Sequence, residues 1–222
     1  MKPRLWIVWG LIILISGSAA AQDYRAEPLM QGSPTEALAP EIAGQIAAQG
    51  VKVARGTQTV AEIWPAKAWS VREDFAPSNT ELYPLQVGAL FGVIRYAGKG
   101  EDFRGREIPA GVYTVRYGLQ PVDGNHLGTS ETRDFLLLLP AKEDTNPQPM
   151  AEADMFELSP KVTATTHPTM LALLRAEGEV ESLPAARHDD AAELWSVRFA
   201  GKSQGKPADL VVEVVIAGHF PE

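Results

Sequence analysis

The chain has 222 residues, no cysteine and a net charge of −8 at pH 7. Without cysteine it cannot be a disulfide scaffold, a thiolate metal site, a cysteine hydrolase or a lipoprotein acylated at an N-terminal cysteine. Its 45% hydrophobic and 22% charged residues are typical of a folded soluble domain rather than a disordered one. The acidic balance argues against nucleic acid or an anionic membrane surface as the main partner.

Residues 1–21 have the pattern of a secretory signal peptide. Two basic residues precede the apolar run 5–15, and small residues ending at Ala21 follow, so we expect cleavage before Gln22. A retained N-terminal anchor is the alternative, but the run is shorter than the roughly 17–25 residues of a spanning helix. The sequence therefore predicts an exported protein, periplasmic or secreted, with no membrane span after cleavage. Its stability must come from an apolar core, which the remaining 201 residues are long enough to build.

Residues 22–50 are predicted to contain an irregular leader followed by a short amphipathic helix. Ser33 and Pro34 have the pattern of a helix start, because a hydroxyl residue suits the cap and proline suits the first helical position. Pro40 is expected to interrupt or restart this helix, and Gly50 to end it. We expect the apolar side of the helix to pack on the core, with docking on a partner as the alternative.

Residues 51–222 are predicted to form a single all-β domain. We expect a mainly antiparallel β-sandwich, Ig-like or jelly-roll-like, with about seven strands and one or two short peripheral helices. Runs of β-branched, aromatic and apolar residues bounded by turn residues predict strands at 59–64, 89–97, 112–119, 134–139, 194–199 and 210–217.

Two of these strands have distinct patterns. Residues 112–119 alternate, which predicts a half-buried strand with Thr114 and Arg116 on the face opposite the core. Residues 134–139 are apolar on both faces, which predicts a central strand covered on both sides. Between the strands, apolar spacing within 146–166 predicts a helix of two or three turns that crosses from one part of a sheet to another.

The connection 120–134 has the densest set of polar side chains. Loops held by a rigid sheet are where binding groups usually lie, so we predict that this loop binds a ligand or partner. The same residue types also hydrogen-bond a long hairpin's own backbone, and a purely structural loop remains the alternative. The predicted binding residues are Asp123, Asn125, His126, Arg133 and Asp134.

Three histidines with polar neighbours raise the alternative of a metal site. Imidazole and carboxylate groups could together bind zinc, copper or manganese if the loops that carry them meet. The spacing does not require this, and His188 followed by two aspartates is also typical of a solvated turn. The predicted ligands are His126, His167, His188 and Asp189. Apart from a divalent transition metal, no cofactor is predicted.

No motif indicates catalysis. The serines lack a Gly-x-Ser-x-Gly elbow or a Ser-x-x-Lys motif, and no glycine-rich loop links a strand to a helix as in nucleotide-binding proteins. The sequence therefore favours a protein that is not an enzyme. Aromatic rings offer a further binding mode if they are exposed, because flat rings stack on sugars or anchor partners. The candidate rings are Trp64, Trp69, Tyr83, Tyr96 and Tyr117.

One long stretch resembles a known family. It includes Ile-Pro-Ala-Gly-Val-Tyr at 108–113 and Tyr-Gly-Leu-Gln-Pro at 117–121, and it continues to Arg-Asp-Phe-Leu-Leu-Leu at 133–138. From about residue 51 to 217 the chain resembles a family of exported bacterial β-sandwich proteins to which no function is assigned. The resemblance implies a β-sandwich and export, and it provides no catalytic residues.

We therefore expect an exported, non-catalytic module that binds a small ligand or a protein partner. A metal-binding periplasmic protein is the alternative, and a hydrolase without a recognisable motif is the third possibility.

Overall fold

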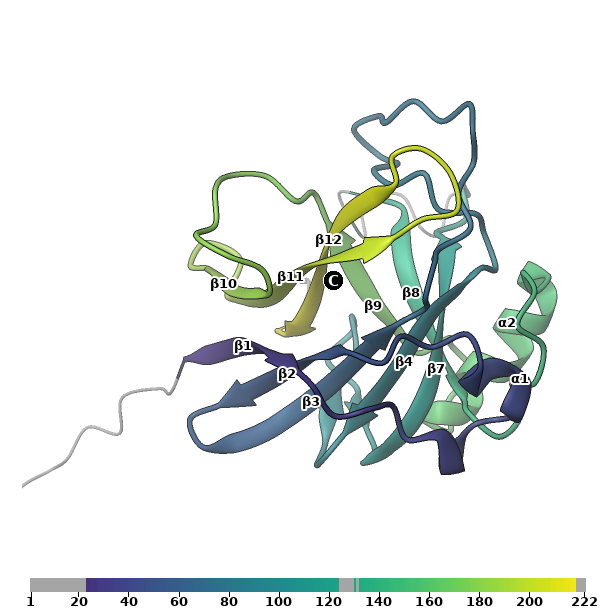
Figure 1. Cartoon of the computed structure of the whole chain (residues 1–222), viewed down its shortest axis with the longest axis horizontal. Helices are drawn as coiled ribbons and strands as arrows, with labels where there is room; N and C mark the ends of the chain where they lie inside the picture. The colour runs from purple at the N-terminus through teal and green to yellow at the C-terminus, as the bar shows by residue number, and fades with distance from the viewer. Residues whose placement is uncertain (1–22, 124–129, 131, 219–222) are drawn as a thin grey trace, which may run out of the picture.

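The computed structural model describes residues 23–123, 130 and 132–218. Its strands are β1 (Tyr24–Leu29), β2 (Gly50–Arg55), β3 (Gln58–Pro65), β4 (Leu90–Tyr96), β5 (Gly100–Glu101), β6 (Glu107–Ile108), β7 (Gly111–Leu119), β8 (Asp134–Pro140), β9 (Met170–Leu174), β10 (Ala185–Asp189), β11 (Leu194–Lys202) and β12 (Asp209–Ala217). Within the described residues, ten antiparallel strands form one sheet in the order β1-β2-β3-β4-β7-β8-β9-β12-β11-β10 (Figure 1), and β5 pairs with β6 separately. The predicted all-β, mainly antiparallel fold with few short helices is confirmed.

The irregular leader is a wrong prediction, because its residues form β1. This strand pairs antiparallel with β2 at the end of the sheet order, and a salt bridge of 2.7 Å joins Lys52 to Glu27 across the pair. Tyr24 and Ala26 turn towards the core, while Arg25 lies on the other side and is exposed. Such alternation is a strand pattern, and Pro28 is tolerated because β1 is an edge strand.

The helical segments match the predictions in part, because the first helix ends at Ala43 and Gly50, expected to end it, begins β2. A 3-10 turn, η1 (Thr35–Ala37), is followed by α1 (Pro40–Ala43), so Pro40 restarts the helix at its first position. Ile42 and Ile46 are fully buried, and the segment therefore packs on the core. The predicted helix within 146–166 is α2 (Glu152–Leu158), continued by the 3-10 turn η2 (Ser159–Val162), and it connects β8 to β9.

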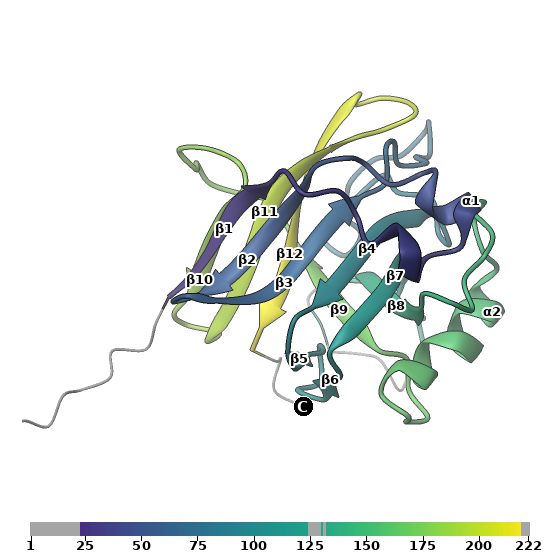
Figure 2. The ribbon, with the colours of Figure 1, turned by 60° about the horizontal axis from the view of Figure 1, so that its bottom comes forward.

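The sheet bends at β9, which changes partner along its length. Its first three residues pair with β8, whereas Leu173 and Leu174 pair with β12. As a result the two ends of the sheet turn towards each other, with β1, β2 and β3 in one layer and β10, β11 and β12 in the other (Figures 1 and 2). The layers meet where β1 lies close to β10, and the ring centroids of Tyr24 and Trp195 are 5.3 Å apart. One curled sheet thus forms both layers, through a strand that serves as a corner.

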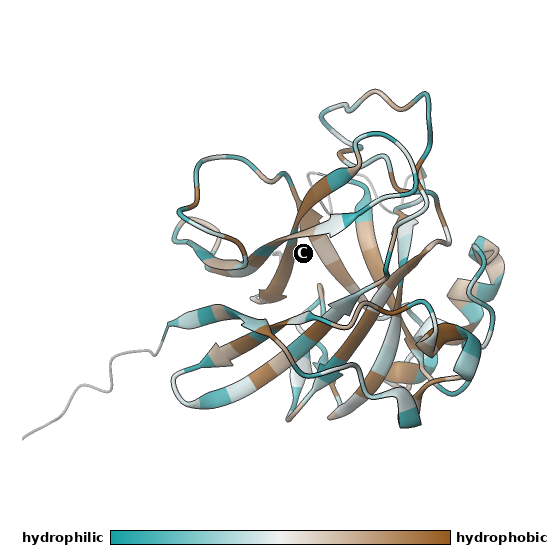
Figure 3. Ribbon diagram, viewed as in Figure 1, coloured by the Kyte–Doolittle hydropathy of each residue, from teal (hydrophilic) through white to brown (hydrophobic). Residues whose placement is uncertain are grey.

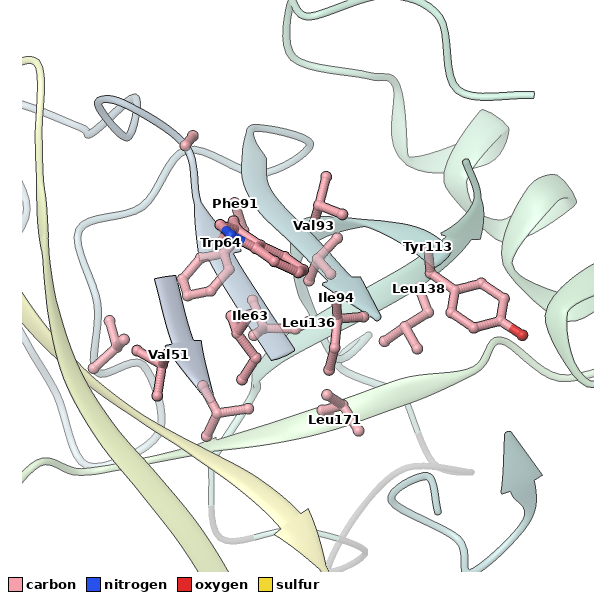
Figure 4. Packing of buried hydrophobic residues seen from close by; sticks show 14 of the residues in the cluster. Val51, Ile63, Trp64, Phe91, Val93, Ile94, Tyr113, Leu136, Leu138 and Leu171 are labelled. Atoms are coloured by element: carbon pink, nitrogen blue, oxygen red, sulfur yellow. The ribbon is translucent and has the colours of Figure 1, made fainter. Parts of the chain in front are cut away.

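Apolar side chains fill the interior of the curled sheet. Figure 3 shows hydrophobic residues along the strands, and Figure 4 shows side chains from β2, β3, β4, β7, β8 and β9 packed against one another. Phe91 stacks on Trp69 with centroids 4.7 Å apart, and Phe199 of the opposite layer meets both rings edge-on. These three rings are almost fully buried, so the interior is a packed core.

Residues 66–89, between β3 and β4, tie the two layers together at one end. The backbone of Trp69 donates to the carbonyl of Lys202 at 2.8 Å, which joins this connection to β11. The Tyr83 hydroxyl donates to the carbonyl of Leu174 at 2.5 Å and accepts from the backbone N–H of Glu213 at 3.2 Å, which joins it to β9 and β12.

The outer face of β7 differs from its prediction. Thr114 and Arg116 are fully buried rather than half exposed, because the chain that follows β8 crosses over them. The Arg116 guanidinium donates to both carboxylate oxygens of Asp144 at 2.7 and 2.8 Å, and to the carbonyls of Gly88 and Gln148 at 2.7 and 2.9 Å. Alternation alone predicts an exposed side chain for Arg116. In the structure Arg116 is buried, and its charge is paired with that of Asp144. The central, doubly covered position of β8 is confirmed.

Candidate functional site

An apolar pocket of about 320 Å³ lies on the outer face of the sheet, between the β5–β6 hairpin, α2 and β9. Most of its walls are apolar side chains, and a few polar groups stand among them, as is usual for small-molecule sites. The apolar walls include Phe103, Leu119, Phe135, Leu137, Phe156 and Met170, and the polar ones are Arg104, Gln120, Thr166 and His167.

The pocket arises because the outer face of β8 is apolar and is covered at two separate places. Phe135 is covered by Phe103 of the hairpin connection, whose ring meets it edge-on at 4.8 Å. Leu137, two residues along β8, is covered by Met155 of α2. The two coverings leave apolar surface between them, and Met170 of β9 lies beside it.

An ion pair between a buried carboxylate and a partly exposed guanidinium holds the walls of the pocket in place. The Asp102 carboxylate, 1% exposed as a residue, accepts hydrogen bonds from the backbone N–H groups of Arg104 and Arg106, both at 2.9 Å. It also binds the Arg106 side chain, whose Nε lies 2.8 Å away. The same guanidinium donates to the carbonyls of Pro168 at 2.6 Å and His167 at 3.3 Å. Arg106 therefore links the hairpin to the segment before β9, and these are two walls of the pocket.

The rim of the pocket has positive character. Arg104 and His167 are exposed, and they are the titratable side chains among the residues that line the pocket. Among the residues that the structure describes, the Arg104 guanidinium makes no hydrogen bond or ion pair, because only its backbone N–H is engaged. No aspartate or glutamate lines the pocket.

The predicted binding loop contributes its beginning to the pocket. Gln120 lines the wall, and its backbone N–H donates to the carbonyl of Arg133 at 2.7 Å, so the two ends of the loop are held together. The Arg133 side chain donates back to the Gln120 carbonyl at 2.8 Å. Asp123 is exposed, while Asn125 and His126 lie outside the described residues.

Asp134, the last of the predicted binding residues, is the first residue of β8 and is fully buried. Its carboxylate accepts from the Tyr117 hydroxyl at 2.7 Å and from the backbone N–H groups of Leu82 and Tyr83 at 2.8 and 3.1 Å. Burial raises the pKa of this carboxyl above its usual value, although the three donors partly offset the shift. This geometry favours a structural role, in which Asp134 fastens the 66–89 connection to the sheet.

The described ligands of the predicted metal site do not converge. His167 lines the apolar pocket, and His188 lines a second pocket of about 370 Å³, where its Nδ1 lies 2.7 Å from an Asp190 oxygen. Asp189 accepts from two backbone amides of the turn that follows it. Within the described part of the chain, no three histidine or acidic side chains are grouped to hold a metal ion. The remaining predicted ligand, His126, lies outside the described residues.

The second pocket contains a buried polar network whose groups already have partners. Glu213 accepts from the Ser196 hydroxyl at 2.6 Å and from Nε of Arg198 at 2.9 Å, and Arg187 approaches it to 3.3 Å. Arg198 also donates to the carbonyl of Gly178 at 2.7 Å. These bonds fasten β10, β11 and β12 to the chain after β9, which is a structural role.

The aromatic residues considered as binding rings are all buried, so the condition for that binding mode is not met. None is more than 4% exposed, because the core requires them. The rings at the pocket are instead phenylalanines. Of these, only Phe135 lies in a strand whose sequence predicts that both of its faces are covered. The buried rings are Trp64, Trp69, Tyr83, Tyr96 and Tyr117.

Comparison with known proteins gives no family model, no curated protein and no solved structure that matches the chain. Among the described helices, none has both the length and the apolar character needed to cross a bilayer.

Proposed function

We propose that this protein is an exported, non-catalytic module that binds a small, largely apolar molecule in the pocket beside β8 and β9. The observation that carries the proposal is a concave apolar surface whose walls are already cross-linked by Asp102 and Arg106. A preformed pocket avoids the cost of ordering its walls when a ligand binds. The loop predicted to bind a ligand forms part of the same pocket through Gln120 and Pro121.

The chemistry of the lining supports binding rather than catalysis. Thr166 is the one hydroxyl residue among the lining residues, and His167 the one imidazole. Among the described residues no hydrogen bond joins their side chains, and the lining contains no carboxylate that could orient the imidazole. A nucleophile, a base and an orienting group are the usual set for covalent hydrolysis, and the described lining lacks the third.

The length of a ligand's alkyl chain is the variable that tests an apolar site most directly. Each buried CH₂ group contributes about 0.8 kcal/mol, so affinity should rise about fourfold per added methylene until the pocket is full. At roughly 30 Å³ for each water-sized group, the pocket accepts about ten non-hydrogen atoms. We expect calorimetric titration with 1-hexanol to 1-dodecanol to show this rise followed by a plateau near ten carbons. Absence of binding across the series would overturn the proposal.

Two neighbouring residues of α2 provide a matched pair of variants. Phe156 lines the pocket, whereas Leu158 packs on the same cluster and does not line it. Phe156→Ala should weaken 1-decanol binding by about tenfold, because it removes an apolar wall worth more than one buried methylene. Leu158→Ala should leave binding within a factor of about two. Equal losses in both variants would mean that α2 acts through stability and does not contact the ligand.

Export is proposed from the signal-like residues 1–21 and is tested separately. Expression of the full chain in a Gram-negative host should place it in the periplasmic fraction with Gln22 as its first residue, read by N-terminal sequencing. Protein that keeps Met1 and stays with the membrane fraction would favour the retained anchor.

A further inference from the structure

We infer that the ligand of this pocket carries a carboxylate at one end of its apolar chain, and that Arg104 binds this carboxylate. The inference rests on the proposed function and names the class of molecule that the same site takes. Its basis is that Arg104, whose guanidinium has no partner among the described residues, lines an apolar pocket that no acidic residue lines.

The charges around the pocket favour an anion. The lining has one cationic group, the guanidinium of Arg104, and no acidic side chain. The carboxylate nearest to Arg104 along the chain, that of Asp102, is buried. It is neutralised by Arg106, whose Nη2 lies 2.5 Å from Asp102 Oδ2. The charge of the lining itself is therefore positive, in a chain whose net charge is −8. Such a lining attracts an anionic group, and an ammonium head would be repelled from it.

The Arg104 guanidinium has no bonding partner among the described residues. The Arg104 backbone is fixed by its bond to Asp102, while the side chain is exposed. A guanidinium presents a planar fork of donors that matches the two oxygens of a carboxylate. His167 stands at the same rim, and its carbonyl is fixed by Arg106 and by the Thr165 hydroxyl at 3.0 Å. A lining of apolar side chains together with one free guanidinium suits a chain with a carboxylate head.

The test compares three probes of equal chain length that differ only at the head. Titration calorimetry of the full protein at low salt should show decanoate binding at least tenfold more tightly than 1-decanol, with decyltrimethylammonium weakest. Raising the salt concentration should weaken decanoate and leave 1-decanol unchanged, because screening acts on the charge alone.

Arg104→Gln removes the charge and keeps a similar length of side chain. We expect this variant to bind decanoate within about threefold of 1-decanol, while its affinity for 1-decanol equals that of the wild type. Lys206→Gln is the matched control, because it removes one exposed positive charge in the β11–β12 loop, away from the pocket lining. This control should bind all three probes as the wild type does.

The outcomes separate the two proposals. Equal binding of decanoate and 1-decanol by the wild type overturns the carboxylate inference and leaves an apolar site standing. A loss of 1-decanol binding in Arg104→Gln also overturns it, because Arg104 would then act as a wall rather than as a charge. If none of the three probes binds, both this inference and the proposed function fail.

Discussion

The two faces of the curled sheet are used in opposite ways. The inner face is filled by side chains from both layers, with Trp69, Phe91 and Phe199 in mutual contact across them. The outer face of β8 is covered in pieces, by α2 and by the β5–β6 hairpin, and a pocket remains between these pieces. In closed or curled sheets of this size the interior either is packed or holds one ligand. Here it is packed, so the candidate site lies outside it.

The outer face itself shows a second contrast. Over β7 the covering chain is sealed by Arg116 and Asp144, both with fully buried side chains. Over β8 and β9 the corresponding ion pair, Arg106 with Asp102, is partly exposed and fastens one wall of an open pocket. The same kind of ion pair closes the surface in one place and frames a cavity in the other. What differs is whether apolar side chains occupy the space between the sheet and its cover.

The largest effect is expected inside the sheet. Phe91→Ala should lower the free energy of unfolding by about 4 kcal/mol, because a large buried ring is replaced by a cavity. Urea denaturation measures this, and Phe75→Ala is the control, since Phe75 is only partly buried and its ring contacts Arg72 at 4.5 Å. The control should lose about 1 kcal/mol. Folded Phe91→Ala should bind 1-decanol as the wild type does; a changed affinity would show that the interior communicates with the pocket.

The sealed part of the outer face should be nearly as sensitive. Arg116→Met should cost about 3 kcal/mol, because it leaves the Asp144 carboxylate buried without its partner. Adding Asp144→Leu to this variant should restore much of the loss, since two apolar residues leave no unpaired charge. Arg95→Met is the control, because the Arg95–Glu62 pair is about one-third exposed on the arginine side and should contribute about 1 kcal/mol or less. A double variant as unstable as the single one would assign the loss to packing.

Much of the fold could be predicted from the sequence because its central strands have strong local patterns. The apolar run of β8 and the alternation of β7 and β12 appear directly in the residues. β1 could not be recognised, because its pairing with β2 supplies the stability that its charged and proline residues do not. The curl of the sheet was also hidden, since it depends on β9 changing partners after Ala172, which no local pattern encodes.

The candidate site was harder to predict than the fold. Its walls come from a hairpin, a helix and two strands that are distant in sequence, so only tertiary packing brings Phe103, Phe156 and Met170 together. Polar density drew attention to the loop after β7, whose first residues line the pocket, and its role in binding stays a prediction. It also singled out Asp134, because a buried carboxylate and an exposed one look the same in a sequence.

The smallest expected effect concerns the buried carboxylate of Asp134. Its titration tests whether the interior at the first residue of β8 is closed to water. Because burial raises the pKa of Asp134, the folded protein binds a proton at a higher pH than the unfolded chain does. The protonated form therefore adds stability below the usual aspartate pKa, and this contribution is lost as the pH rises through the folded value. As the pH falls from 7 to 4, wild-type stability should rise relative to Asp134→Asn, measured by urea denaturation of both at each pH.

Tyr117→Phe sharpens the same measurement. The Tyr117 hydroxyl donates to the carboxylate and lowers the pKa of Asp134, so removing it should raise that pKa further. In the Tyr117→Phe background, the stability gained from protonating Asp134 should begin to appear at a higher pH than in the wild type, again relative to the corresponding Asp134→Asn variant. A shift to lower pH would mean that water replaces the hydroxyl and reaches the carboxylate. The interior at the start of β8 would then be open to water. The contrast between a closed interior and an open outer pocket would not hold at Asp134.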